Sequence, residues 1–370
     1  MSRAQWISGS LVVLSLSGCA QLLGYADLEG AAPDAALDAS LDAAASDSPT
    51  DAASEVDAIA GGARWPSRPA GERVASGKGS SLALGVQSFH IGSLTRLGER
   101  APNAWREWGF DLDDTCTDEA AANAGVGTCK PASGSAAINL IDGDNCRDNN
   151  FGSQLVVKVL NVFSPDFETK GNASVHTGSA TWVFVIDDLD DGADDPYAPG
   201  TYYLVTPFAD GAPNPAFDGT DVRTIDTRSV IDGDPKKVRQ RFPNGYVAGN
   251  VWVSGDLGPA TFLFPNGKAA AAPLDIPAVV LTMRLATDHE GGREGNLAGV
   301  ITPAGLVDFI RPVAESGGVC STNPVFATLA ANVAEYPDLV VGAKNLQDPT
   351  KTCDGISIGL GFDVGPVKIG

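Results

Sequence analysis

The residues best suited to chemistry in this sequence are aspartates grouped in three acidic loops. Hard cations such as calcium take six to eight oxygen ligands, and closely spaced Asp and Asn side chains in a turn can supply several of them. We therefore take calcium as the candidate cofactor. The candidate ligands are Asp111 and Asp113 in the first loop, Asp142, Asp144 and Asp148 in the second, and Asp187, Asp190 and Asp191 in the third.

The first two loops are the stronger candidates, because they could be joined in space to form one site. Neither is an EF-hand, since the twelfth position counted from Asp111 is Ala122 and the twelfth from Asp142 is Ser153, where the motif needs a bidentate Glu. The alternative is that these turns bind no metal, because Asp and Asn favour turns for backbone reasons alone.

The sequence offers little for catalysis. Its three histidines, His90, His176 and His289, lie in no HExxH motif, and no serine lies in a GxSxG motif. A non-enzymatic role is therefore expected. The alternative is a carbohydrate-active protein, either a calcium-dependent glycan-binding module or a polysaccharide hydrolase, with aromatic rings that stack on sugars instead of filling the core. Those rings are Trp105, Trp108, Trp182, Trp252, Tyr202, Tyr203 and Tyr246.

The N-terminus has the residue order of a bacterial export signal. Arg3 precedes an apolar run that closes at Leu16-Ser17-Gly18-Cys19, with small residues around the cysteine. The run is shorter than the roughly 20 apolar residues that a membrane-spanning helix needs. We expect residues 1–18 to be a lipoprotein signal peptide and Cys19 to be the lipidated residue.

A strongly acidic segment follows. Residues 20–60 contain nine acidic residues and no Lys or Arg, so they cannot bury enough apolar area to offset the entropy of ordering. We expect a disordered linker over 19–75 and a single β-rich domain over 76–370; an Ala-rich helix is the alternative for the linker. The net charge of the whole chain is −21, which excludes nucleic acid as a favoured partner.

Five cysteines remain after the lipidated one, and none of them forms a CxxC pair, which argues against a zinc ribbon or a thioredoxin-type site. In an oxidising compartment we expect disulfides between Cys116 and Cys129 and between Cys320 and Cys353. Cys146 is then left over, although five cysteines permit other pairings.

Hydrophobic patterning predicts a mainly β body, an antiparallel sandwich or jelly-roll-like fold with a few accessory helices. The 179–186 and 201–206 strands should form a hairpin with a long connection, and 296–301 should return antiparallel to 279–285. Helices are expected over 151–162, 303–313 and 324–334; Asp148 or Asn149 caps the first, for which a strand is the alternative. The expected strands are 81–91, 179–186, 201–206, 222–230, 246–253, 260–264, 279–285, 296–301 and 356–364.

Short motifs in the body resemble those of a group of uncharacterised secreted lipoproteins of large-genome Gram-negative bacteria. The resemblance covers most of residues 105–364, implies one co-evolving body and supplies no catalytic residues. Glycine is more typical of the group at the position of Cys146, which fits an unpaired thiol there. The motifs are Gly109-Phe110-Asp111-Leu112-Asp113, Asp142-Gly143-Asp144, Asp148-Asn149-Asn150-Phe151-Gly152, Phe217-Asp218-Gly219-Thr220-Asp221-Val222 and Cys353-Asp354-Gly355-Ile356-Ser357-Ile358-Gly359.

Ala20, directly after the acylated cysteine, resembles the signal that sends bacterial lipoproteins to the outer membrane. These features together predict a cell-envelope protein, held at the membrane by its N-terminal lipid, with a structural or binding role. Calcium would stabilise its body, and its partner would be a protein or a glycan.

Overall fold

The computed structural model describes residues 63–77, 79–123, 128–131, 141–161, 165–209, 211–266, 269–316 and 319–370. The expected signal peptide, Cys19 and the linker up to residue 62 lie outside the described residues. Residues 63–71 lie against the body. The Trp65 ring packs edge-on against Phe110 with centroids 5.6 Å apart, and the Tyr246 hydroxyl donates to the Pro66 carbonyl at 2.6 Å.

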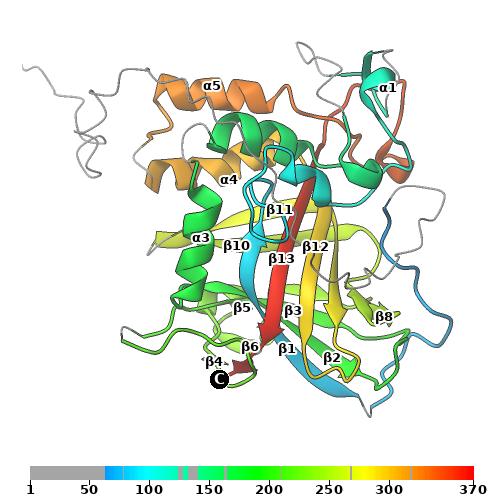
Figure 1. Cartoon of the computed structure of the whole chain (residues 1–370), viewed down its shortest axis with the longest axis vertical. Helices are drawn as coiled ribbons and strands as arrows, with labels where there is room; N and C mark the ends of the chain where they lie inside the picture. Colours follow the sequence, from blue (N-terminus) through cyan, green and yellow to red (C-terminus); the bar gives the residue numbers. More distant parts are fainter. Residues whose placement is uncertain are drawn as a thin grey trace, which may run out of the picture.

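The body is built on one antiparallel sheet, which confirms the mainly β prediction (Figure 1). The strand order is β7-β3-β2-β1-β13-β12-β11-β9-β8, and β10 pairs with β11. The strands of this sheet are β1 Ser80–His90, β2 Thr181–Leu189, β3 Gly200–Val205, β7 Gln240–Phe242, β8 Tyr246–Ala248, β9 Val251–Val253, β10 Gly258–Asn266, β11 Ala269–Leu285, β12 Gly292–Ile301 and β13 Ile356–Pro366.

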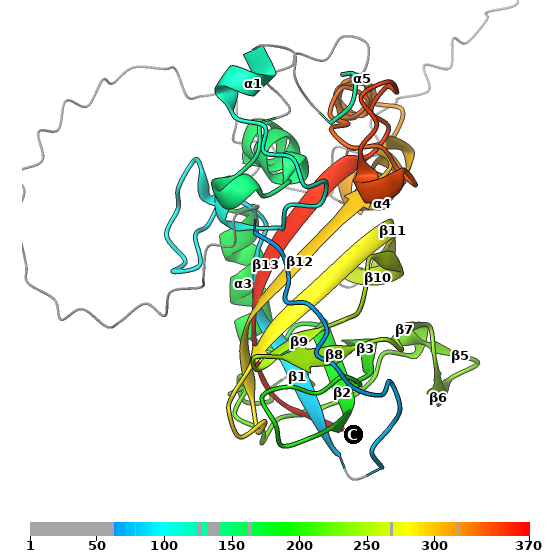
Figure 2. The same ribbon diagram turned by 90° about the vertical axis from the view of Figure 1, so that its right-hand side faces the viewer.

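Helices lie at one end of the sheet and along one side (Figures 1 and 2). Two small strand pairs complete the fold: β4 with β14, in parallel, and β5 with β6. The small strands are β4 Val222–Arg223, β5 Val230–Ile231, β6 Asp234–Val238 and β14 Lys368–Ile369. The helices are α1 Glu119–Asn123, the π-helix Phe151–Leu160, α3 Phe167–His176, α4 Pro303–Ser316 and α5 Pro324–Val333. Short 3-10 turns lie at Ala104–Glu107, Asp144–Cys146, Thr227–Ser229 and Lys344–Leu346.

Most of the expected elements are confirmed. β2 and β3 form the hairpin with the long connection, and β12 returns antiparallel along β11 with Leu297 opposite Leu281. The two proline-initiated helices are α4 and α5. The helix expected over 151–162 begins at Phe151 but has π geometry, and Asn149 caps it by accepting a hydrogen bond from the Gly152 N–H at 3.0 Å.

Two expected strands are wrong as single strands. Over 222–230 only the ends are extended, because the Asp226 carboxylate accepts a hydrogen bond from the Arg228 N–H and folds the middle into a 3-10 turn. Over 246–253 the chain reverses between β8 and β9. Gly249 and Asn250 both have positive φ there, 57° and 62°, as a tight two-residue hairpin turn requires.

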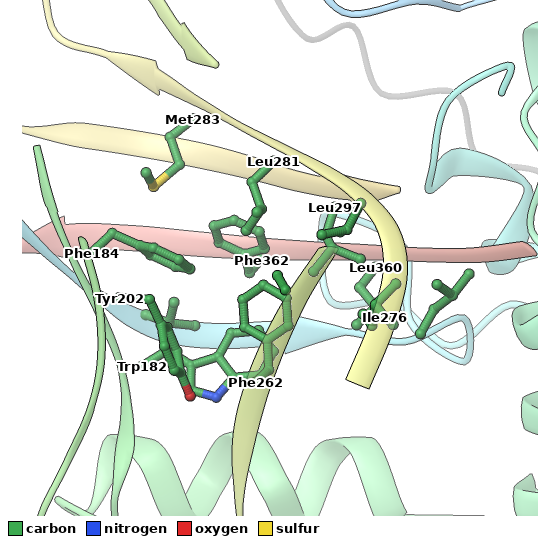
Figure 3. Close-up of a cluster of buried hydrophobic side chains, with 14 of the residues drawn as sticks. Trp182, Phe184, Tyr202, Phe262, Ile276, Leu281, Met283, Leu297, Leu360 and Phe362 are labelled. Atoms are coloured by element: carbon green, nitrogen blue, oxygen red, sulfur yellow. The ribbon is translucent and has the colours of Figure 1, made fainter. Parts of the chain in front are cut away.

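The sheet curls around its main hydrophobic core, so both faces of the sandwich-like interior come from the same sheet. Rings from β2 and β3, including Trp182 and Tyr202, face Phe262 on β10, with ring centroids 5.2 Å from it in each case (Figure 3). β10 leaves the plane of its neighbours and lies against β3 and β7, near the opposite edge of the sheet (Figure 2).

Side chains join the two ends of the curl at Leu263. The indole Nε1 of Trp182 donates to the Leu263 carbonyl at 3.0 Å, and the Tyr202 hydroxyl donates to the same carbonyl at 2.9 Å. The Leu263 N–H in turn donates to the Tyr202 hydroxyl at 3.0 Å. Side chains therefore form hydrogen bonds with the Leu263 N–H and carbonyl, which would otherwise need a neighbouring strand as their partner.

We predict that Tyr202→Phe lowers the free energy of unfolding by about 1–3 kcal/mol, because it leaves the Leu263 N–H without its partner. Urea unfolding measures this change. Tyr203→Phe is the matched control, since its hydroxyl makes only a 3.5 Å contact to the Pro235 carbonyl near the surface. Equal losses in the two variants would contradict this role of Tyr202.

Candidate functional site

The first two acidic loops lie side by side. The Asp148 N–H donates to the Phe110 carbonyl at 3.0 Å, and the Leu112 N–H donates back to the Asp148 carboxylate at 2.6 Å. Further along, the Asp142 N–H donates to the Thr117 carbonyl at 2.9 Å, and the Thr117 N–H donates to the Asp142 carboxylate at 2.5 Å. The two loops are therefore joined in space, as expected from the sequence.

Disulfides hold the same loops together, in a pairing that differs from the expected one. Cys116 is bonded to Cys146, and Cys129 is bonded to Cys353, so the expected Cys116–Cys129 and Cys320–Cys353 pairs are wrong and Cys146 is not left over. The expectation favoured partners close in sequence. The disulfides instead join different loops, and the second one links residues that are 224 positions apart.

Three carboxylates converge where the loops meet. Asp111, Asp113 and Asp148 each offer an oxygen, and these three atoms lie within 4.8 Å of one another. All three residues are buried, with 3%, 1% and 3% of their surface exposed. Oxygens bound to one calcium ion at about 2.4 Å are at most about 4.8 Å apart, so this spacing suits a single ion.

Strand β13 supplies the floor beneath the loops. The Asn149 side-chain oxygen accepts the Gly359 N–H at 2.9 Å, and the Asn150 N–H donates to the Ser357 hydroxyl at 2.7 Å. Trp108 packs flat on β13, where a Cβ at Gly361 would lie only 2.1 Å from its ring. Glycine at this position is what allows the first loop to approach the sheet.

A fourth buried carboxylate, Asp338, was not anticipated from the sequence. It accepts hydrogen bonds from the Ser357 N–H at 2.7 Å and from the Ser357 hydroxyl at 2.5 Å. The signal in the sequence is slight: one acid within the apolar run Tyr336-Pro337-Asp338-Leu339-Val340. The Ser357 hydroxyl also accepts the Asn150 N–H at 2.7 Å, so Asp338 lies next to the second loop.

Burial raises the pKa values of these carboxyl groups, because a charge loses its hydration there. Burial, together with the smaller effect of neighbouring carboxylates, raises the pKa of Asp113 to about 6, of Asp338 to about 7 and of Asp142 to about 9. The pKa of Asp148 is raised well above its ordinary value for the same reason. Among the described residues, no basic side chain forms an ion pair with these four groups; Arg64 and Arg106 pair instead with Asp114 and Asp144.

The remaining predicted ligands lie elsewhere. Asp144 is exposed and forms an ion pair with Arg106 at 2.9 Å, so it does not point into the cluster. In the third loop, Asp187 accepts a hydrogen bond from the Ser81 hydroxyl at 2.9 Å and Asp190 accepts one from Ser76 at 2.8 Å, while Asp191 is exposed. Within the described part of the chain, only Asp111, Asp113 and Asp148 form a converging group of this kind.

An open cleft of about 550 Å³ lies beside the buried carboxylates. Asp142 and Asp144 line it from the second loop, and Asp118 and Glu119 line it from the first. Most of the aromatic rings considered for sugar stacking lie elsewhere and are buried in the body, which does not favour a glycan-binding face. The buried rings are those of Trp108, Trp182, Trp252, Tyr202 and Tyr246.

Comparison with known family models, curated proteins and solved structures finds nothing that matches this chain. Among the described residues, no helix has both the length and the apolar character needed to cross a membrane. The geometry of the carboxylate cluster is therefore the main guide to function.

We predict that the metal-free protein becomes less stable as pH rises from about 5 to about 8. The folded state keeps protons on Asp113, Asp142, Asp148 and Asp338 that an unfolded chain, with Asp pKa values near 3.9, has already released. For each such proton, the free energy of unfolding falls by about 1.4 kcal/mol for every unit by which the pH rises.

Urea unfolding across this pH range, in the presence of a chelator, measures the effect. Asp142→Asn should flatten the pH dependence, because the amide oxygen can still accept the hydrogen bond from Thr117 and carries no charge. Stability that rises with pH in the metal-free protein would contradict the assignment of these four groups.

Proposed function

We propose that this protein is a lipid-anchored cell-envelope protein with a non-enzymatic structural or binding role, and that a calcium ion bound between its first two acidic loops stabilises its β-rich body. The observation that carries the calcium part is the convergence of three buried carboxylates, those of Asp111, Asp113 and Asp148. The lipid anchor is supported by the sequence Leu16-Ser17-Gly18-Cys19.

The donor set supports a hard cation. It consists of carboxylate oxygens alone, with no thiolate or imidazole, and such a set suits calcium or magnesium better than zinc or copper. A divalent ion would also offset the cost of burying ionised carboxylates, because it favours their charged form. Calcium is preferred to magnesium because it tolerates irregular geometry, as expected for ligands taken from two loops.

The role expected of this ion is structural. Its ligands belong to the loops that Cys116–Cys146 and Cys129–Cys353 tie to one another and to the residues preceding β13. An ion bound there would fix the loops on the end of the sheet and shape the cleft lined by Asp118, Glu119 and Asp142. That cleft is the proposed position for a partner.

We predict that millimolar calcium raises the thermal unfolding temperature of the full chain near neutral pH and that EDTA reverses the effect. Binding at 100 times the dissociation constant is worth about 2.7 kcal/mol. The stabilisation should decline towards about pH 5, because protons compete for the raised-pKa carboxylates.

Asp113→Asn should abolish the calcium response. Asp191→Asn is the matched control, since it removes the same charge from an exposed position in the third loop. Absence of any shift with calcium, or loss of the response in both variants, would contradict the proposed site.

For the lipid anchor, we predict that mass spectrometry of the N-terminal peptide from the native host shows a chain that begins at Cys19 and carries a diacylglyceryl thioether. Cys19→Ser should leave the precursor unprocessed and shift the protein from the membrane fraction to the soluble fraction. An unprocessed N-terminus, or Cys19 found in a disulfide or as a free thiol, would contradict the anchor.

A further inference from the structure

The most basic part of the chain is a hairpin that projects from the body. Residues 228–241 contain five Lys or Arg residues and two acids, whereas the chain as a whole has 25 basic and 46 acidic residues. Figure 2 shows β5 and β6 extending away from the lower end of the sheet, at the far end from the helices α4 and α5. The five cations are Arg228, Lys236, Lys237, Arg239 and Arg241.

The hairpin that carries these charges has a tight turn and is attached to the main sheet. Asp232 and Gly233 have φ values of 54° and 70°, which closes a tight two-residue turn between β5 and β6. Val230 and Val238 are buried at its base, with 3% and 9% of their surface exposed. The Ser229 hydroxyl bonds to the backbone of Leu204 on β3, so the hairpin is fixed to the main sheet.

All five cationic side chains are exposed, and three of them, Lys236, Arg239 and Arg241, form no ion pair with a described residue. Arg228 pairs with Asp226 at 2.6 Å, and Lys237 lies 3.9 Å from Asp234. Arg239 and Arg241 each donate to a backbone carbonyl, at 2.8 Å and 3.0 Å, which positions their guanidinium groups without cancelling the charge. Among the described residues, Lys236 has no ion pair.

We infer that this basic hairpin, Arg228 to Arg241, is a docking surface for the phosphate-bearing headgroups of an anionic membrane. Guanidinium groups bind phosphate through two parallel hydrogen bonds, and each basic residue near an anionic lipid surface is worth about 1 kcal/mol. Ile231, at the turn, is 43% exposed and places an apolar side chain beside these charges, as interfacial segments do.

The inference rests on the proposed lipid anchor, because the anchor would bring the hairpin close to such a surface. The rest of the chain is acidic and would be repelled by anionic lipid. Hairpin contact would therefore orient the body, with one end against the membrane and the carboxylate cluster, at the helical end, away from it.

Vesicle co-sedimentation tests this surface with the full chain carrying Cys19→Ser, so that acylation plays no part. The chain should bind vesicles made of equal parts of phosphatidylglycerol and phosphatidylcholine, fail to bind vesicles of phosphatidylcholine alone, and dissociate as salt is added. The combined variant Lys236→Gln, Lys237→Gln, Arg239→Gln should bind about a hundredfold more weakly, at about 1 kcal/mol per charge.

The matched control is Lys170→Gln, Arg293→Gln, Lys344→Gln, which removes the same charge from three exposed, scattered positions. Equal weakening in the control, or no binding to anionic vesicles, would overturn the docking surface. Binding to anionic vesicles that appears only after the nine acids of residues 20–60 are replaced by amides would also overturn it. That result would mean that the acidic segment, and not a membrane, binds the basic hairpin in the intact chain. An unmodified Cys19 in the native protein would refute the anchor without changing these vesicle results.

Discussion

Carboxylates removed from water must hold protons or meet a positive charge, and this requirement governs the end of the sheet where the loops gather. Asp113, Asp142 and Asp148 are buried within the two loops, and Asp338 lies beneath them beside β13. Backbone N–H groups of Leu112, Thr117 and Ser357 satisfy part of their hydrogen-bonding capacity but leave their charge uncompensated. Packing, disulfides and glycines in this region all act to keep the four groups together.

Strand β13 connects this region to the hydrophobic core. Alternate residues of β13 face opposite sides: Ser357, Gly359 and Gly361 meet the loops, whereas Ile358, Leu360 and Phe362 lie in the core. The side-chain bridge from Trp182 and Tyr202 to Leu263 keeps the curl closed on the far side of the core. The site and the core thus share β13, one on each of its faces.

Much of this architecture could be predicted from the sequence, because strands and helices follow local patterning. The joining of the loops that contain Asp111 and Asp142 was also within reach, since both are turns rich in Asp. The disulfides were not, because partners such as Cys129 and Cys353 meet only after β13 is in place. Asp338 gives only a slight local signal, one acid in an apolar run. The reversal between β8 and β9 did have a signal, the Gly249-Asn250 pair, because both residues adopt the left-handed conformations of a two-residue hairpin turn.

The position of β13 has a further consequence. It lies between a half-sheet of β1, β2, β3 and β7 and a half-sheet of β8, β9, β11 and β12, and it pairs with β1 and β12 at once. The strand that unites the two halves occupies residues 356–366 of a chain of 370 residues. Because β13 pairs with β1 across roughly 270 residues, with Phe89 opposite Phe362, the contact order is high, and such non-local pairing slows folding.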